Sequence, residues 1–210
     1  MAYAVKEMFL TLQGEGVNAG ARAVFVRFAG CNLWSGREID RARAVCQFCD
    51  TDFVGTDGEG GARFADAQAL VAAAAEHWGA DRRHRFVVLT GGEPMLQVDD
   101  ALVEALHAAD FRIAIESNGT LPVHPDIDWV CISPKAGSDI VQRNGDELKL
   151  VWPQAGTDVD ELERWDFTHH LIQPLDDRDA AAHRQAAMAL VMARPWWRLT
   201  LQTHKMLAIR

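Results

Sequence analysis

The sequence of 210 residues predicts an α/β fold in which a parallel sheet curves into a full or partial barrel. Short, near-continuous apolar runs rich in β-branched residues recur along the chain, and amphipathic helix candidates lie between them. Strands that are buried on both faces have this composition, and their alternation with helices is typical of parallel βα units. In such folds the active site lies at the carboxyl ends of the strands, which is where the polar motifs of this sequence fall.

Six strands are expected, because each run is followed by Gly, Pro, Asn or Ser. The runs are AVFVRFAG (23–30), FVVLTGGEP (86–94), RIAIESNGT (112–120), WVCISPKAG (129–137), LKLVWP (148–153) and HLIQPL (170–175). Helices are expected at 64–79, with Gly79 as the stop signal, and at 99–110, with Asp99 as the cap. The stretch 57–64 is expected to form a loop, and 193–210 a final strand and tail.

Composition and charge limit the classes of partner and function that fit the sequence. The chain is 49% hydrophobic, which predicts a single domain over residues 1–210. It carries 21 Lys and Arg against 30 Asp and Glu, without a basic run, which argues against nucleic acid or an acidic membrane as the partner and favours a small ligand. The N-terminus lacks a signal-peptide pattern, and the longest apolar run (69–75) is too short to span a bilayer. We therefore expect a soluble, cytoplasmic protein.

Three of the four cysteines, Cys31, Cys46 and Cys49, lie in one segment with the spacing C-x14-C-x2-C. This pattern indicates metal binding or redox chemistry in a reducing compartment. A structural zinc would need a fourth ligand, and the nearest downstream histidine is His77, inside an expected helix. Three thiolates alone leave an open coordination position. Cys131 alternates within an apolar strand and is expected to pack in the core.

The cysteine segment, with Phe48 just before its last cysteine, and a downstream strand ending in GGEP resemble the radical S-adenosylmethionine (SAM) superfamily. The resemblance implies a partial, modified (β/α)6 radical-SAM barrel in which Cys31, Cys46 and Cys49 hold a [4Fe-4S] cluster and SAM chelates the fourth iron. The usual spacing there is C-x3-C-x2-C. This sequence has fourteen residues in the first gap, so we expect an enlarged cluster loop at 31–49 that forms a turn or a short helix, at a closure cost of roughly 1 kcal/mol or less.

The motif LTGGEP resembles the SAM amino-group site of the superfamily, which implies that Gly91, Gly92 and Glu93 contact the SAM ammonium. Glycine lets backbone carbonyls approach a ligand closely, and glutamate supplies charge. The ordinary alternative is a strand-to-helix turn that places Pro94 at the first helical position.

The motif ISPK implies that Ser133, Pro134 and Lys135 surround the SAM carboxylate and ribose, and a point cation such as lysine suits a carboxylate. A strand end with a solvated lysine is the alternative. The same resemblance assigns cofactor contacts to Phe48 and Asp50.

A finer resemblance covers nearly the whole chain, because eight motifs occur in the order seen in 7-carboxy-7-deazaguanine synthases. They are EMFLTLQGEG, VRFAGCNLW, CDTDF, LTGGEP, IESNGT, CISPKAG, LIQPLD and LQTHK. The resemblance implies conversion of 6-carboxy-5,6,7,8-tetrahydropterin to 7-carboxy-7-deazaguanine, a step toward queuosine, by hydrogen abstraction at C6, ring contraction and loss of an amine as ammonia. It also implies SAM as a regenerated cofactor, Mg²⁺, an electron donor and a homodimer.

Residues of these motifs suit a pterin. Gln13 and Glu116 offer the amide and carboxylate groups that a guanine-like edge requires. Arg27 is a bidentate partner for the substrate carboxylate, with a structural ion pair as the alternative. Thr51 is the Mg²⁺ ligand that the family implies, and Mg²⁺ takes few protein ligands. The other expected substrate contacts are Leu12, Gly14, Glu15, Thr90, Gln173, Pro174 and His204. For Glu15, a solvated turn residue is the alternative.

The tail carries apolar residues on odd positions, which predicts a strand with one buried face. These residues are Leu199, Leu201, Leu207 and Ile209. His204 would lie on the other face, and the family resemblance of QTHK implies that it lies near the pterin, so that we expect the tail to close the pocket. A solvated histidine on an edge strand is the alternative.

Two rival functions remain at this stage. An activase that installs a glycyl radical in a partner protein would share the cluster and GGE, but it has no need of QGEG, ESNGT and QTHK. A zinc-stabilised binding module would need the three cysteines only for folding.

Overall fold

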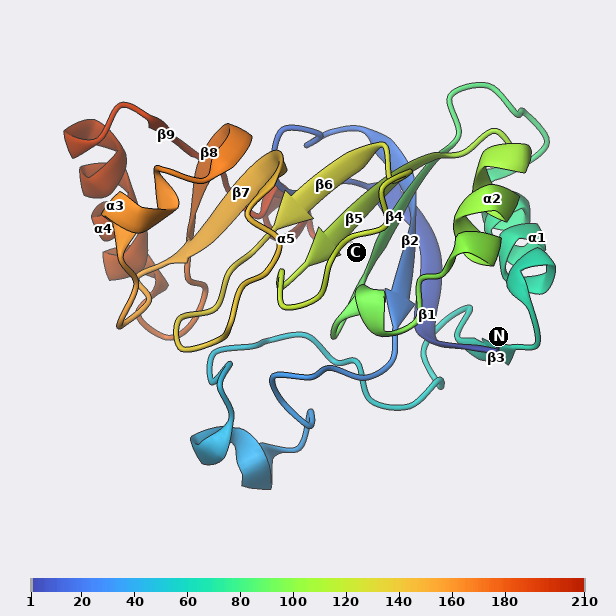
Figure 1. Cartoon of the computed structure of the whole chain (residues 1–210), viewed down its shortest axis with the longest axis horizontal. Helices are drawn as coiled ribbons and strands as arrows, with labels where there is room; N and C mark the ends of the chain where they lie inside the picture. The colour runs from blue at the N-terminus through green and yellow to red at the C-terminus, as the bar shows by residue number, and fades with distance from the viewer. Residues whose placement is uncertain (1, 210) are drawn as a thin grey trace.

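The computed structural model describes residues 2–209, which form one nine-stranded sheet with the order β3-β1-β2-β4-β5-β6-β7-β8-β9 (Figure 1). The strands are β1 (Tyr3–Leu12), β2 (Arg22–Phe28), β3 (Ala62–Phe64), β4 (Phe86–Gly91), β5 (Arg112–Ser117), β6 (Trp129–Ile132), β7 (Asn144–Trp152), β8 (Asp166–Pro174) and β9 (Trp197–Leu199). The helices are α1 (Ala67–Trp78), α2 (Asp100–Ala108), α3 (Val159–Leu162), α4 (Ala180–Ala193) and α5 (Thr203–Leu207), with 3-10 turns η1 (Glu38–Arg43) and η2 (Pro94–Leu96). Met1 and Arg210, the ends of the expected domain, lie outside the described residues.

The sheet is parallel from β2 to β9, and only β1 and β3 among the described strands pair antiparallel with their neighbours. β3 and β9 are its outermost strands, so the described barrel is partial. The six expected strands are β2 and β4 to β8, which confirms the predicted α/β class. In Figure 1, α1 and α2 lie at one end of the sheet, α3 and α4 at the other, and the segment around η1 projects away from the sheet.

The helix expected at 64–79 is present with a later start and ends at Gly79 as predicted, whereas the loop expected at 57–64 is wrong at its end. The helix expected at 64–79 begins at Ala67, because Asp66 caps it by accepting a hydrogen bond from the Ala69 amide (2.9 Å). The end of the expected loop 57–64 instead forms β3, which pairs with β1. The sequence does not predict β1, since polar side chains interrupt its apolar pattern. By contrast, Asp99 caps α2 as expected.

The strand expected for the tail is also wrong. The chain leaves β9 after three residues and turns into α5, which leaves the Leu207 side chain 60% exposed. The turn is fixed by Thr203, whose amide and hydroxyl both donate to the Gly14 carbonyl at 2.9 Å. A contact with the distant β1–β2 connection therefore overrides the local alternation.

Packing of the apolar core positions the carboxyl ends of the parallel strands. Apolar side chains of the first strands pack under α1 and α2, including Val26, Leu89 and Ile113, which are fully buried. This packing brings the carboxyl ends of β2 and β4 to β8 to one edge of the sheet. Among residues 2–209, no helix combines the length and the apolar composition of a membrane-spanning segment.

Candidate active site

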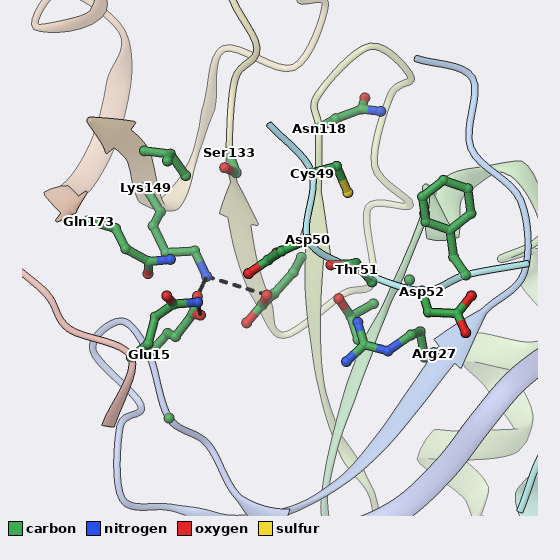
Figure 2. A pocket seen from close by; sticks show the side chains of 18 of the residues that line it. Glu15, Arg27, Cys49, Asp50, Thr51, Asp52, Asn118, Ser133, Lys149 and Gln173 are labelled. Atoms are coloured by element: carbon green, nitrogen blue, oxygen red, sulfur yellow. Dashed lines mark hydrogen bonds and ion pairs between the residues drawn. The ribbon is translucent and has the colours of Figure 1, made fainter. Parts of the chain in front are cut away.

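A cavity of about 490 Å³ opens at the carboxyl ends of the parallel strands (Figure 2). Its wall includes side chains from β2, β4, β5, β7 and β8, from the loops that follow them, and from α5. Of the expected site residues, all except Glu93 and Pro134 line it. Residues far apart in the sequence are therefore gathered at one place.

Three cysteines form part of the cavity wall. Cys46 is buried, and Cys31 and Cys49 are partly exposed to the cavity. A hydrogen bond between Cys46 and Cys49 raises the pKa of Cys46 and lowers that of Cys49 to about 6. Cys131 lies in β6, 5% exposed and outside the cavity lining, so its place in the core is confirmed.

The three sulfurs do not surround a single ion. Among residues 2–209, no three His, Cys, Asp or Glu side chains converge on a point that could hold one metal ion. A four-iron cluster has a different requirement, because each thiolate binds a different iron and the sulfurs stay apart. Three cysteines on the wall of one cavity are the donor set of an iron-sulfur cluster with one open position.

The enlarged loop is organised by Arg41. Its guanidinium pairs with Glu38 (2.7 Å), stacks over Trp34 (4.0 Å to the ring centroid) and donates to the carbonyls of Gln47 (2.9 Å) and Cys49 (3.0 Å). The expected short helix is present as η1. The loop is thus fastened to the backbone that carries the second and third cysteines.

The two glycines at the end of β4, Gly91 within it and Gly92 just after it, allow other backbone segments to approach closely. Gly91 has φ +140°, and a Cβ there would overlap the Phe28 backbone, while a Cβ on Gly92 would overlap the Gly30 carbonyl. These close approaches set the end of β4 against the residues just before Cys31. Both glycines also line the cavity.

Glu93 differs from its expected position at the ligand. It is fully buried, and its carboxylate accepts hydrogen bonds from the Met95 amide (2.9 Å), the Ser117 hydroxyl (2.8 Å) and the Asn118 amide (2.8 Å). Burial raises its pKa. The structure thus gives Glu93 the task of fixing the end of β5 to the turn after β4.

The residues after β6 divide between two cavities. Lys135 donates to the carbonyl (2.6 Å) and hydroxyl (2.7 Å) of Ser133, and its ammonium lies 6.0 Å from the Phe48 ring centroid. Desolvation lowers the pKa of Lys135. Pro134 lines a smaller neighbouring cavity of about 210 Å³ instead.

Glu15, Glu116 and Lys149 form an ion network on the cavity wall. Figure 2 shows Lys149 and Glu15 of this network. The Lys149 Nζ lies 2.5 Å from Glu15 and 3.3 Å from Glu116, and Gln13 donates to the second oxygen of Glu116 (2.9 Å). Burial disfavours the charge on Glu15, but Lys149, Gln202 and His204 together lower its pKa to about 2. Glu15 is therefore a paired anion and not a solvated turn residue.

Arg27 stands in a row of three neighbouring strands. In the sheet register it lies opposite Glu7 on β1 and Thr90 on β4, and its Nε bonds to Glu7 at 2.7 Å. All three residues line the cavity. The structural ion pair considered as the alternative is present, and Nε is the one side-chain atom of Arg27 that has a hydrogen-bond partner among the described residues.

The segment after Cys49 is anchored at both ends of Asp50–Asp52. Lys205 pairs with Asp50 (3.0 Å), and Lys6 pairs with Asp52 (2.9 Å). The Thr51 amide and hydroxyl donate to the Cys49 sulfur and help to lower the pKa of that cysteine. Thr51 itself faces the cavity.

The tail contributes to the cavity wall, although as a helix and not as the expected strand. The His204 ring fills the space that a side chain at position 14 would need, which explains Gly14. His204 and Lys205 both line the cavity, and Lys205 also pairs with Asp176 after β8 (2.7 Å).

Sequence reasoning missed several cavity residues. They are Lys6, Glu7, Asn118, Lys149, Asp176, Gln202 and Lys205. For Lys149 a signal was present, because a lysine between Leu148 and Leu150 on an apolar strand must be buried and so needs partners. Lys6 and Glu7 lie on β1, which the sequence does not predict, and the others lie in loops or on the tail, without such a signal.

Comparison with known proteins agrees with this geometry. Residues 40–149 match the radical SAM superfamily. The chain is 59% identical to the 7-carboxy-7-deazaguanine synthase of Burkholderia multivorans and 56% identical to that of Bordetella pertussis, over 100% of both chains in each case. The crystal structure of QueE from Escherichia coli has a TM-score of 0.71 at 26% identity, covering 96% of this chain and 94% of that one. The chain therefore belongs to the 7-carboxy-7-deazaguanine synthase family of the radical SAM superfamily.

Proposed function

We propose that the protein converts 6-carboxy-5,6,7,8-tetrahydropterin to 7-carboxy-7-deazaguanine, with ring contraction and loss of ammonia, on the way to queuosine and related 7-deazapurines. One observation carries the proposal. A single cavity combines a wall of three thiols with a network of amide and carboxylate groups, in a chain that aligns end to end with synthases of that name.

The cavity residues fit the implied cofactors. Cys31, Cys46 and Cys49 would hold the cluster, while the Gly91 and Gly92 backbone and the Lys135 ammonium would bind the amino-acid part of SAM. When bound, the cluster and SAM together supply the one-electron reduction and the radical that removes a hydrogen atom from the substrate. The protein binds, orients and excludes water around these groups.

Three side chains are suited to the substrate. Arg27 uses only Nε for Glu7, so its Nη atoms can bind a carboxylate in the bidentate manner that guanidinium favours. Gln173 is 6% exposed, and its Oε1 has no hydrogen-bond partner among the described residues. A buried unpaired acceptor is costly, and an N–H group of a bound pterin would satisfy it. The Thr90 hydroxyl lies beside Arg27 in the register.

Thr51 is our candidate for Mg²⁺. Its hydroxyl hydrogen is directed to the Cys49 sulfur, which leaves the oxygen lone pairs for a cation. Mg²⁺ takes few protein ligands and keeps several waters, so one hydroxyl with substrate oxygens is sufficient. Thr51→Ala is expected to make turnover less responsive to added Mg²⁺, and an unchanged dependence would move the metal to other residues.

The remaining parts of the proposal concern organisation. One radical SAM domain with its cluster loop at 31–49, a homodimer and an external one-electron donor are what the family resemblance implies. Light scattering of the purified protein tests the dimer. For in-vitro turnover, a chemical reductant replaces the donor.

The decisive experiment is anaerobic incubation of the reduced protein with SAM, Mg²⁺ and 6-carboxy-5,6,7,8-tetrahydropterin, followed by mass analysis. We expect 7-carboxy-7-deazaguanine from the wild type and none from Cys49→Ala, whereas Cys131→Ser retains turnover. A colourless protein with stoichiometric zinc would contradict the proposal. Deoxyadenosine formation that requires a partner protein and not the pterin would point to a glycyl-radical activase.

A further inference from the structure

Lys149 holds a charge at a place where burial makes a charge costly. It lies in the middle of β7, is 5% exposed, and lines the cavity. Moving an isolated ammonium from water into the protein interior costs roughly several kcal/mol of desolvation free energy, so a buried lysine needs close partners. Glu15 at 2.5 Å, labelled with Lys149 in Figure 2, and Glu116 at 3.3 Å are those partners.

Each of the two carboxylates has its oxygens divided in the same way. One oxygen of Glu15 accepts from Lys149 and the other from the Gln202 amide (2.9 Å). One oxygen of Glu116 accepts from Lys149 and the other from the Gln13 amide (2.9 Å). Lys149 is thus the shared member that joins β7 to β5 and to the β1–β2 connection.

A purely structural ion network would not need to face a cavity. Here every member lines it, and two carboxylates face one ammonium, so the network has an excess of one negative charge. A carboxylate oxygen has more than one lone pair, so both acids can still accept from a ligand. Such a wall suits a ring that presents adjacent N–H donors and disfavours one that presents carbonyl oxygens.

The geometry points to Lys149 as a positioning residue that fixes Glu15 and Glu116 to read the N–H donor edge of the ring substrate. The inference rests on the proposed function for the identity of that substrate. The role of Lys149 itself does not depend on the identity of the substrate. Without Lys149, two carboxylates would face each other in a buried site, and one would take up a proton. A protonated acid presents a donor where the ligand also presents one.

The first test needs no ligand. With ¹³C-labelled glutamate carboxyls, Glu15 of the wild type, assigned with Glu15→Gln, should not titrate above pH 4, since its pKa is about 2. In Lys149→Met the midpoint should move up by at least two pH units. Lys6 is a matched control, because it is also a buried cavity lysine but pairs with Asp52 and Asp57. Lys6→Met should leave the Glu15 titration unchanged.

Other titratable groups near this network must be considered in the same titration. They are Cys131 on β6, Lys135 after β6, Glu147 on β7 and His204 on α5. Glu147 is engaged with the Trp129 indole and the Val17 amide, at 2.5 and 3.2 Å. A wild-type Glu15 midpoint in Lys149→Met would overturn the inference.

The second test measures the preference of the protein for one of two ligands. The affinity for 6-carboxypterin, which carries a 2-amino group, is to be compared with that for 6-carboxylumazine, which has a carbonyl oxygen at this position, with SAM present. The wild type should prefer the pterin, and Lys149→Met should reduce this preference at least tenfold while SAM affinity stays within twofold. If Lys149 had only a structural role, its loss would lower the affinity for both ligands equally. An unchanged ratio of the two affinities would therefore overturn the inference.

A double variant that keeps the net charge of the network allows the test even if Lys149→Met does not fold. If Lys149→Met does not fold, Glu15→Gln/Lys149→Met removes one charge of each sign, and its ligand preference should fall below that of Glu15→Gln alone. Equal preferences would overturn the inference. Failure of the wild type to bind either ligand would instead refute the proposed function, which the titration does not test.

Discussion

The four cysteines have two kinds of surroundings. Cys31, Cys46 and Cys49 line one cavity, whereas Cys131 is buried in β6, between Glu116 and Glu147 in the sheet register and outside the cavity lining. The mutual hydrogen bond raises the pKa of Cys46 and lowers that of Cys49, which favours the thiolate form of Cys49. Thiolate is the form that binds iron.

Replacing each cysteine should separate these roles. Cys31→Ala, Cys46→Ala and Cys49→Ala are expected to lose the cluster and all SAM cleavage, as measured by iron and sulfide content and by deoxyadenosine release. Cys131→Ser should keep both and lose roughly 1–3 kcal/mol of unfolding free energy, because it buries a hydroxyl. Loss of the cluster in Cys131→Ser would show that the four cysteines are wrongly divided.

Arg27 has two tasks that a substitution can distinguish. Arg27→Lys keeps the charge but loses the planar fork, so we expect the pterin affinity to fall about tenfold, roughly 1.4 kcal/mol, with SAM affinity unchanged. Glu7→Gln, which alters only the structural pair, is the matched control and should have a smaller effect on affinity. Undiminished pterin binding by Arg27→Lys would leave Arg27 with the ion pair alone.

The enlarged loop depends on one side chain for its attachment to the cysteine segment. Arg41→Ala removes the bonds to the Gln47 and Cys49 carbonyls, so the cluster should be lost faster in the presence of a chelator. Arg43→Ala is the control, because Arg43 is exposed and has no recorded partner among the described residues. Equal rates of loss for both variants would mean that the loop does not protect the cluster.

The tail helix α5 should act as a lid. Truncation after Thr203 removes His204 and Lys205 from the cavity wall, and we expect near-normal cluster content with no conversion of the pterin. His204→Ala distinguishes a lost contact from a lost fold and should weaken turnover in a fully folded protein. Full turnover by the truncated protein would refute the lid.

The ion network joins distant parts of the whole molecule, so stability should depend on it. The pKa of Glu15 is about 2 in the folded protein, against an ordinary 4.5, and its charge therefore contributes stability above about pH 4.5 that is lost as the pH falls toward 2. Glu15→Gln should reduce the unfolding free energy by roughly 2 kcal/mol at pH 7. In urea unfolding the difference from wild type should shrink between pH 4.5 and 2, and a constant difference would contradict this account.

Several features were predictable because their causes are local. The caps at Asp99 and Gly79, the parallel strands and the polar motifs at their ends follow from turn chemistry and apolar runs. Nearly every site residue expected from the cysteine spacing and the ordered motifs lines one cavity in the structure. The tail was mispredicted, because its alternation is local but its conformation is set by Gly14.

The sequence alone was sufficient for the α/β class, the three-cysteine centre and the family, since these depend on residue types at short spacings. Only the tertiary structure decided how charges are paired. Lys149 meets Glu15 across 134 residues, and Thr203 meets Gly14 across 189. A buried charge takes the partner that packing brings within reach, and no local pattern encodes that partner because the free energy of the pair depends on the folded surroundings.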